Sequence, residues 1–467
     1  MNHNFIFIFI INIFHIYSIK FNTHKNSLNN FFILLTENNP LLLNQNNQNI
    51  DNYGHIPVLS SKEGLYTLNL NIGTPRQQFN LILDTCSPLL WINDNNCFGC
   101  KSKNNFISKQ SNSFYSSNDK ISINYLSGEI SGNICKDTIE FNFNNSIIKG
   151  FNFLLVNKTN IDFDIHGIFG LSKGVDNIIN LEYSTINQIY KNGIIKNNIF
   201  LLDFSKNSFY IGEIPQYLNK YNNFTCKGIN GNKFDNYYWN CNFDKLQFNN
   251  NNKIISSKSK DKNNIIFNSG TNCLIFPLNY VIIFEDIISD NKLLNKSMCY
   301  IKSNNINNNI YSLICNDISS LIDGKNKEYQ NIYNNEEFIT FYINNDNNEN
   351  KIYLKLNDLY NKNESNFNIY FAPTPNNAII LGIPFFEKYT ILLNKDNNEV
   401  IIYEENNNII KDNSIFLKIF IGIFIAIIII LILLIIYRII RKTQKSVSSS
   451  QIEKQFSNFG FFQPEIP

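Results

Sequence analysis

The sequence predicts an all-β fold of two similar lobes, followed by a single C-terminal transmembrane helix. Apolar and polar residues alternate from Tyr66 onward, which is typical of strands with one buried face. A strand that ends in a short polar turn occurs twice, at 79–87 and 265–272, and such a repeat implies two lobes with a cleft at their junction. Near the C-terminus, Ile419–Tyr437 is an apolar stretch of 19 residues without a charge.

Length and composition agree with this fold class. A chain of 467 residues has room for two or three domains, or for one large bilobal domain. Its 43% hydrophobic content is enough for sizeable cores, and Asn, roughly a fifth of the chain, gathers in runs typical of solvated loops. The net charge of +2, without a basic stripe, gives no reason to expect a nucleic-acid partner. The five His residues are scattered, and we expect no metal and no cofactor.

The N-terminus predicts entry into the secretory route. Phe5–Tyr17 is an apolar run whose length suits the core of a signal peptide better than a spanning helix, although neither a basic flank nor an Ala-x-Ala site accompanies it. We expect a signal peptide at 1–20. The Asn-rich stretch at 21–60 fits a leader or a propeptide-like segment.

The C-terminal apolar stretch predicts a membrane anchor at 415–437. A buried core helix is the alternative, and the length of the uncharged run disfavours it. Basic residues follow directly, at Arg438, Arg441, Lys442 and Lys445, and such residues mark the cytosolic side of a membrane span. The sequence therefore predicts a single-pass type I membrane protein with a cytosolic tail at 438–467. Its ectodomain would be lumenal or extracellular.

All nine cysteines lie between Cys86 and Cys315, which is consistent with an oxidised ectodomain. Three close pairs are plausible disulfides: Cys97 with Cys100, Cys226 with Cys241, and Cys299 with Cys315. Cys86, Cys135 and Cys273 remain, and an odd count leaves at least one cysteine unpaired. The sequence leaves the connectivity open. The Cys-x-x-Cys at 97–100 has a redox or zinc pair as an alternative, which the lack of a second such motif and of a nearby His disfavours.

Five sequons are compatible with a secreted glycoprotein, and in so Asn-rich a chain several arise by chance. They are Asn144, Asn157, Asn223, Asn295 and Asn363.

The first lobe, predicted at 61–205, contains the first candidate for a functional site. Tyr66–Ile72 and Phe79–Leu83 are predicted strands, separated by a turn at 73–75. The second strand delivers Asp84, and Thr85, Cys86 and Ser87 follow at once. A carboxylate at the end of an apolar strand is costly to bury unless it is hydrogen-bonded or paired, so Asp84 is a site candidate. A turn-capping Asp is the plainer alternative.

The remaining elements of the first lobe follow in order. Ile121–Tyr125 is a predicted strand, followed by a turn at 126–132 and by β pattern at 139–143. Gly167–Leu171 reads apolar-apolar-Gly, which lets a strand pass close behind a neighbouring segment. We expect a helix at 180–191, and strands at 200–212 that close the lobe.

The second lobe, predicted at 206–405, repeats this order. Ile265–Phe267 is an apolar strand that ends in Asn268, Ser269, Gly270 and Thr271, and Ile379–Ile383 repeats the apolar-apolar-Gly pattern. A short helix at 385–389 and strands at 390–393 and 399–403 complete the prediction.

The order of these motifs resembles the pepsin-like aspartic peptidases. Ile-Gly-Thr-Pro at 72–75 precedes Asp-Thr at 84–85, and each turn is followed by an apolar-apolar-Gly strand. The resemblance covers about Gly64 to Tyr403. It implies two β lobes, an interlobe cleft for a peptide substrate, and hydrolysis of internal peptide bonds by two Asp residues that share a water, without a cofactor.

The resemblance also implies roles for individual residues. Asp84 matches the first catalytic Asp, and Asn268 stands at the second. Thr85 and Ser269 match the positions that lock the turns together, with Gly270 and Thr271 completing the second turn. Ser87 matches the hydroxyl beside the first carboxylate, and we expect Asn272 at the corresponding place in the second turn. Tyr125 matches the Tyr of the flap, a hairpin over the cleft, and Trp91 matches its support; ordinary packing of these aromatics is the alternative.

Two departures from the family pattern concern the chemistry. Two carboxyls about 3 Å apart share one proton, as the aspartic-protease pair itself illustrates, so that one acts as base and the other as acid. Asn268 keeps the shape of the second carboxyl, but an amide exchanges no proton near neutral pH. Cys86 replaces a Gly, and we expect its β-carbon and sulfur to crowd the position of the water.

The sequence thus predicts a pepsin-like aspartic endopeptidase homologue on a type I membrane anchor. We expect reduced or absent activity, with a peptide-binding cleft or an interaction module retained. An active aspartic endopeptidase of the secretory system is the alternative, either despite Asn268 or after its deamidation to Asp. A β-rich surface protein unrelated to peptidases is a third possibility. Metalloenzyme and serine hydrolase chemistry find little support.

Overall fold

The computed structural model describes most of the region of family resemblance. The described residues are 54–61, 64–141, 146–174, 180–229, 231, 233–248, 253–256, 263–290, 299–305, 309–315, 327–345, 348–361, 366–405, 422, 424–439 and 441. The predicted signal peptide, most of the predicted leader and most of the predicted tail lie outside them.

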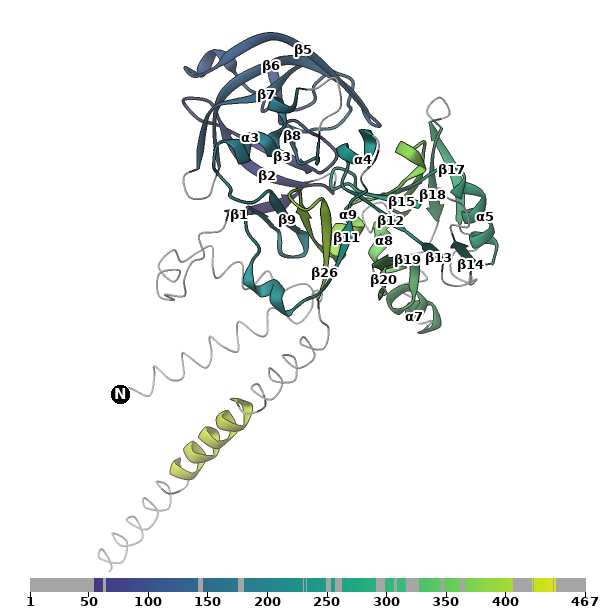
Figure 1. Cartoon of the computed structure of the whole chain (residues 1–467). Coiled ribbons are helices and arrows are strands. Elements are labelled where there is room, and N and C mark those ends of the chain that lie inside the picture. Colours follow the sequence, from purple (N-terminus) through teal and green to yellow (C-terminus); the bar gives the residue numbers. More distant parts are fainter. Residues whose placement is uncertain are drawn as a thin grey trace, which may run out of the picture. The chain divides into compact units, whose positions relative to one another are not determined.

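The largest sheet among these residues has 13 strands, in the order β11-β26-β25-β9-β10-β1-β2-β3-β8-β4-β7-β6-β5, and β2 also pairs with β6. Figure 1 shows β2, β3 and β5 to β8 as one group of strands, coloured from purple to teal. The strands are β1 Gly54–Ser60, β2 Tyr66–Ile72, β3 Gln77–Asp84, β4 Trp91–Phe98, β5 Tyr115–Tyr125, β6 Gly128–Phe141, β7 Ile147–Thr159, β8 Gly167–Gly170, β9 Ile199–Asp203, β10 Ser208–Ile211, β11 Asn222–Lys227, β25 Thr390–Asn394 and β26 Glu399–Glu404.

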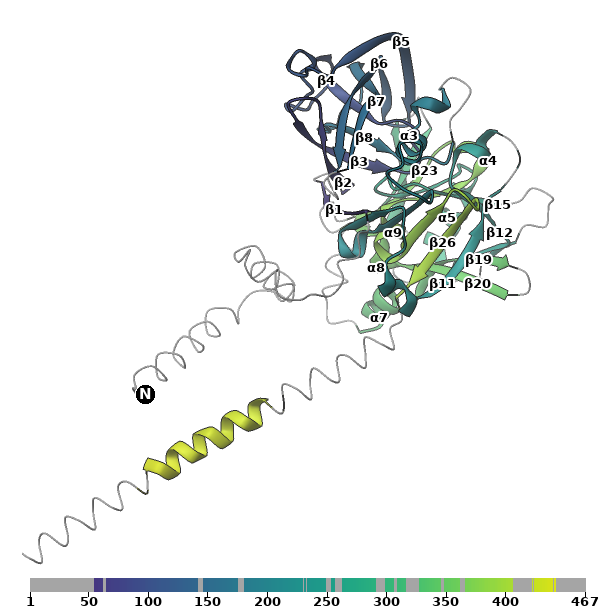
Figure 2. The ribbon, with the colours of Figure 1, turned by 60° about the vertical axis from the view of Figure 1, so that its left-hand side comes forward.

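Three smaller sheets lie between β11 and β25 in the sequence. A seven-stranded sheet has the order β12-β15-β24-β16-β23-β18-β17, a four-stranded sheet β14-β13-β19-β20, and a two-stranded sheet joins β21 and β22. Figure 2 shows β12, β15, β19 and β20 among them. The strands are β12 Asn240–Phe243, β13 Lys245–Phe248, β14 Lys253–Ser256, β15 Asn263–Phe267, β16 Leu274–Phe276, β17 Cys299–Asn305, β18 Ile310–Cys315, β19 Glu337–Asn345, β20 Asn348–Lys355, β21 Tyr360–Asn361, β22 Asn366–Phe367, β23 Ile369–Phe371 and β24 Ile379–Leu381.

The helices of the sheet-forming region are short, so the prediction of a mainly β fold is confirmed. They are α3 Thr185–Lys191, α4 Lys233–Tyr237, α5 Tyr280–Asp290, α7 Lys327–Asn335, α8 Leu356–Leu359 and α9 Ile383–Lys388, with single 3-10 turns η2 Ser108–Gln110, η3 Leu181–Tyr183, η4 Phe204–Lys206, η5 Gln216–Lys220 and η6 Pro375–Asn377. The helix predicted at 180–191 is divided into η3 and α3 by Ser184, whose backbone is not helical.

The β5–β6 hairpin differs in one respect from its prediction. A turn was expected at 126–132, but β6 begins at Gly128, because Ile130 is a buried residue of the strand and pairs with Ile123. The turn therefore comprises only Leu126 and Ser127.

Strands from distant parts of the chain meet at β9. β9 pairs with β10 on one side and with β25 on the other, where Leu202 lies opposite Ile391. The predicted boundary between the lobes, at 205/206, falls in η4 between β9 and β10. The division into lobes stays a prediction. β9, one of the strands expected to close the first lobe, also pairs with β25 from the end of the predicted second lobe.

The alternation at 66–72 is confirmed, since Tyr66, Leu68, Leu70 and Ile72 are buried and the residues between them are partly exposed. Two parallel pairings then position the polar turns. β3 pairs with β8, with Asp84 opposite Gly170, and β15 pairs with β24, with Phe267 opposite Leu381. Each turn thus follows a buried strand that has an apolar-apolar-Gly strand beside it.

Three disulfides confirm the close cysteine pairs: Cys97–Cys100, Cys226–Cys241 and Cys299–Cys315. The second joins β11 to β12, and the third joins β17 to β18. Cys86, Cys135 and Cys273 take part in no disulfide.

Residues 424–439 are helical and exposed. Within the described part of the chain, no helix is both long enough and apolar enough to cross a membrane. Residues 415–421 and 423 of the predicted span lie outside that part.

Candidate active site

In the first turn, neutral hydrogen-bond donors hold the buried carboxylate of Asp84. Asp84 is 4% exposed at the end of β3. Its Oδ1 accepts from the backbone N–H of Cys86 at 2.8 Å, and its Oδ2 accepts from the Ser87 hydroxyl. Burial raises the pKa of the Asp84 carboxyl, while the bonds from Ser87 and from the backbone oppose this shift.

The second turn repeats this arrangement with an amide. Asn268 follows β15, and its Oδ1 accepts from the backbone N–H of Gly270 at 2.8 Å. In both turns the backbone N–H of the residue two positions later donates to the side-chain Oδ1, and both distances are 2.8 Å. Asn268 therefore has the local geometry of Asp84, and the NH2 group is its remaining hydrogen-bonding group.

Four hydrogen bonds lock the two turns together in a reciprocal pattern. Thr85 Oγ1 donates to the carbonyl of Phe267 at 2.7 Å and accepts from the N–H of Ser269 at 3.0 Å. Ser269 Oγ donates to the carbonyl of Leu83 at 2.7 Å and accepts from the N–H of Thr85 at 3.1 Å. Both side chains are fully buried, so these bonds join segments 184 residues apart where water does not compete.

Different bonds join each turn to the strand beside it, from Leu171 N to the Asp84 carbonyl at 2.7 Å and from Asn268 N to the Leu381 carbonyl at 2.9 Å, but a glycine approaches the backbone closely behind both turns. A β-carbon on Gly170 would lie 2.5 Å from the carbonyl oxygens of Ser87 and Leu89, and one on Gly382 would lie 2.1 Å from that of Cys273. Only Gly permits such close approach, which gives the apolar-apolar-Gly motifs their physical reason.

One sequence prediction about the second turn is wrong. Asn272 was expected to correspond to Ser87, but the backbone assigns that place to Thr271. A β-carbon on Gly170 would lie 2.5 Å from the Ser87 carbonyl oxygen, and one on Gly382 would lie 2.5 Å from the Thr271 carbonyl oxygen. Both residues stand three positions after the head of their turn, so counting from Asp84 and Asn268 is sufficient to find the match. Thr271 Oγ1 lies 3.4 Å from Cys273 Sγ.

Gly270 and Cys86 occupy equivalent places. A β-carbon on Gly270 would lie 2.5 Å from both Cγ and Oδ1 of Asp84, so the second turn approaches the carboxylate closely. The first turn carries a thiol at this place. Its Sγ lies 3.9 Å from the Phe267 carbonyl oxygen, and the side chain packs on the cluster that contains Ile266 and Cys273. Burial, with a further contribution from Asp84, raises the pKa of this thiol.

Tyr125 and Trp91, predicted for the flap and its support, are brought to Asp84. Tyr125 ends β5 at the tip of the β5–β6 hairpin, and its hydroxyl accepts from Trp91 Nε1 at 3.0 Å. The hydroxyls of Tyr125 and Ser87 are hydrogen-bonded at 3.1 Å. Trp91, Tyr125 and Ser87 thus form a chain of hydrogen bonds that ends on the carboxylate.

Tyr237 is a site residue that the sequence analysis missed. Its phenol is largely buried, and burial together with Tyr238, Tyr125, Cys86 and Asp84 raises its pKa. It ends α4, its carbonyl accepts from Gly174 N at 3.3 Å, and its ring packs edge-on against Tyr238 with centroids 4.6 Å apart. Nothing local in the sequence relates Tyr237 to a turn 153 positions earlier, at Asp84.

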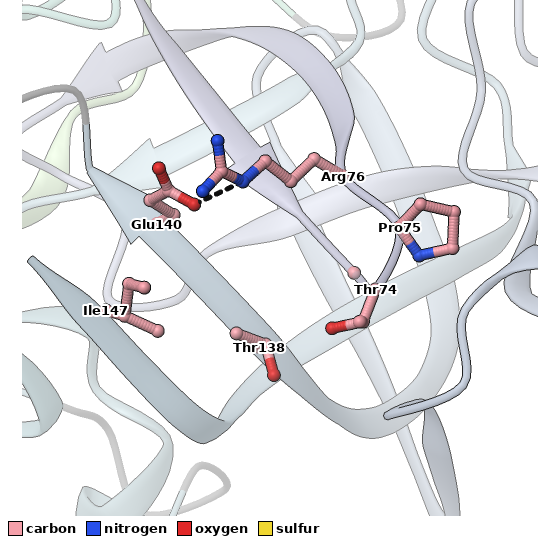
Figure 3. Close-up of a pocket in the computed structure, with 7 residues that line it drawn as sticks. Thr74, Pro75, Arg76, Thr138, Glu140 and Ile147 are labelled. Atoms are coloured by element: carbon pink, nitrogen blue, oxygen red, sulfur yellow. Dashed lines mark ion pairs between the residues drawn. The ribbon is translucent and has the colours of Figure 1, made fainter. Parts of the chain in front are cut away.

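A pocket of about 450 Å³ lies elsewhere, at the β2–β3 turn (Figure 3). Arg76 and Glu140 form an ion pair across it, with Nε and Oε2 2.5 Å apart. The turn is at the opposite end of β3 from Asp84, so this hollow is separate from the candidate site.

A mainly β fold in which two such turns meet through buried hydroxyls defines a pepsin-like aspartic protease. A family model described as "Eukaryotic aspartyl protease" matches residues 65–404. The chain therefore belongs to the eukaryotic aspartyl protease family.

Curated relatives agree with this membership. The chain is 30% identical over 147 residues to pregnancy-associated glycoprotein 2 of Sus scrofa, covering 31% of this chain and 33% of the relative. It is 31% identical over 163 residues to aspartic protease 6 of Caenorhabditis elegans, covering 33% of this chain and 39% of the relative. It is 27% identical over 163 residues to pepsin A of Rhinolophus ferrumequinum, covering 30% and 38%. Each match thus spans under two fifths of the relative.

Proposed function

We propose that this chain is a pepsin-like homologue with impaired peptide hydrolysis, which binds extended peptides at the site around Asp84 and Asn268. The observation that carries the proposal is the hydrogen bond from Gly270 N to Asn268 Oδ1, at 2.8 Å. It repeats the bond from Cys86 N to Asp84 Oδ1, so an amide occupies the place of the second carboxylate.

The chemical consequence follows from what an amide lacks. Asp84 alone still orients a water as a base, but Asn268 donates no proton to the tetrahedral oxygen or to the leaving amine. Loss of this general acid–base contribution reduces turnover by about 10²–10⁴-fold. The thiol of Cys86, where the second turn has Gly270, adds a steric obstacle beside the same water.

The alternative is an active endopeptidase, and the preserved environment of Asp84 supports it. Conversion of Asn268 to Asp would require attack of the Ser269 nitrogen on the Asn268 side-chain carbonyl. That nitrogen donates to Thr85 Oγ1 at 3.0 Å, so the native turn opposes the cyclisation.

The test is cleavage of a diverse peptide library by the detergent-solubilised full chain, from acidic to neutral pH. We expect no pepstatin-sensitive cleavage and measurable binding of a subset of the peptides. Cleavage by the natural protein that disappears in Asp84→Ala would establish the alternative. Mass spectrometry of the peptide that contains Asn268 checks that the amide is intact.

We further propose that residues 415–437 anchor the protein in a membrane of the secretory system, with the ectodomain lumenal or extracellular. The described part of this stretch is apolar and exposed, and Arg438 and Arg441 follow it. Resistance to carbonate extraction and protease protection of the tail test this topology. Removal by carbonate would contradict it.

N-glycosylation is part of the same proposal. Asn157 and Asn223 have exposed side chains. The sequons at Asn144, Asn295 and Asn363 lie outside the described residues. Glycosidase treatment followed by peptide mapping identifies the occupied sites, and a chain without glycans would contradict the proposal.

A further inference from the structure

Asp84 is a buried carboxylate whose charge is not balanced. Its hydrogen-bond partners, the Cys86 N–H and the Ser87 hydroxyl, are neutral. Burial raises the pKa of Asp84, and no cation among the described residues opposes this shift. A buried carboxylate without a positive partner is costly, because it loses its hydration without a Coulombic gain.

Because Asn268 stands where a second carboxyl would be, the protein itself provides no shared proton to stabilise the charge of Asp84. In a pair of carboxyls the second member holds the shared proton and stabilises the charge of the first. The amide instead offers an NH2 donor without charge, because its Oδ1 is engaged by Gly270 N. The centre of the site therefore presents one anionic acceptor beside one neutral donor.

Aromatic groups gather around this carboxylate. Tyr125 is linked to it through Ser87, and burial raises the pKa of Tyr237, with smaller contributions from Tyr125 and Asp84 among others. Tyr238 packs on the ring of Tyr237 and, like Cys86, on the cluster of Ile266. A carboxylate together with aromatic rings is the environment that favours a cation over a neutral group of the same shape.

We propose that the peptides bound at this site carry a lysine or arginine side chain, whose cationic head pairs with Asp84 next to Tyr125 and Tyr237. This inference rests on the proposed function and adds the chemical class of the ligand. The cation supplies the charge that the buried carboxylate lacks. A neutral side chain leaves Asp84 unpaired and therefore binds more weakly.

The experiment measures the affinity of the full-length protein for short acetylated and amidated alanine-rich peptides that differ in one central residue. That residue is lysine, arginine or norleucine, an uncharged counterpart of lysine. We expect the lysine and arginine peptides to bind roughly ten- to a hundredfold more tightly, as for a hydrogen bond to a charged group. Asp84→Asn should abolish the preference for lysine and arginine over norleucine, and Tyr237→Leu should reduce it.

Calorimetry of the natural protein in buffers of different ionisation enthalpy provides a measurement that needs no variant. A cation lowers the pKa of Asp84, so the lysine peptide should release protons on binding wherever Asp84 is partly protonated. The norleucine peptide should release none.

Each other outcome has one meaning. Equal affinities for the lysine and norleucine peptides would overturn this inference and leave the proposed function intact. A preference that persists in Asp84→Asn would also overturn it, since the cation would then bind elsewhere. If no peptide of the set or of the diverse library binds, the proposed function fails, and this inference with it.

Discussion

The two turns of this protein share a geometry and differ in chemistry. Asp84 and Asn268 each accept from the residue two positions on at 2.8 Å, and Thr85 and Ser269 exchange reciprocal hydrogen bonds. Yet one turn begins with a carboxylate and has a thiol two residues later, whereas the other begins with an amide and has a glycine two residues later. The comparison teaches that the hydrogen-bond scaffold depends on the hydroxyls and the glycines. The acid–base function depends on whether the first residue of the turn carries a carboxyl or an amide group.

The largest expected effect comes from making the turns chemically alike. In the double variant Asn268→Asp with Cys86→Gly, we expect peptide cleavage to rise by about 10²–10⁴-fold, because acid and base are both present and the water has room. Initial rates on a fluorogenic peptide library measure this. Addition of Asp84→Asn is the control and should abolish the gain. A double variant that folds but stays inactive would show that the turns differ in more than these residues.

Next in size is the effect of filling the close approach behind each turn. We expect Gly170→Ala and Gly382→Ala each to lower the free energy of unfolding by about 3 kcal/mol, since the new β-carbon meets backbone oxygen within 2.5 Å. Chemical denaturation measures both. Gly193→Ala is the control, with nothing within 4 Å and a positive φ of +68°, and should cost about 1 kcal/mol. If only one of these two substitutions lowered the free energy of unfolding, the two turns would not be structurally equivalent.

A smaller effect is expected from the hydroxyls that join the turns. Thr85→Val and Ser269→Ala should each lower the free energy of unfolding by about 2 kcal/mol, because each leaves a buried N–H and a carbonyl without a partner. The double variant should cost less than the sum, since both residues belong to one network. Chemical denaturation of the natural protein, the two single variants and the double variant gives the coupling free energy between Thr85 and Ser269. Strict additivity would argue against a reciprocal lock.

The smallest effect concerns pH. Because burial raises the folded-state pKa of Asp84 above its ordinary value of 3.8, its contribution favours folding most below that value. This contribution is lost as the pH rises through the folded-state pKa. The natural protein should therefore lose stability relative to Asp84→Asn over that window. Thermal unfolding of both proteins across pH measures the difference. If the natural protein instead gained stability relative to Asp84→Asn as the pH rises, Asp84 would be paired with a cation.

Much of the site could be predicted from the sequence because its parts are local. Asp84, Thr85 and Ser87 form one turn, and their bonds to the carboxylate span two or three residues. The three disulfides follow in the same way from close pairs of cysteines. The error at Asn272 also arose within a local motif, and it is corrected by the matching approaches of Gly170 to Ser87 and of Gly382 to Thr271.

Other features depend on contacts between distant segments. Nothing near Tyr237 in the sequence relates it to Asp84, and the approach of Gly270 to the carboxylate requires both turns to be in place. The pairing of β9 with β25 likewise joins residues that only folding brings together.

The sequence alone determined the strands, the family pattern and the identity of the two departures, since periodicity and motif order are properties of short segments. The tertiary structure decided how the turns interlock, which residue matches Ser87, and which aromatic groups surround Asp84. The physical reason is that buried hydrogen bonds and close backbone approaches specify a site only when both partners are present. For this site those partners lie 184 residues apart.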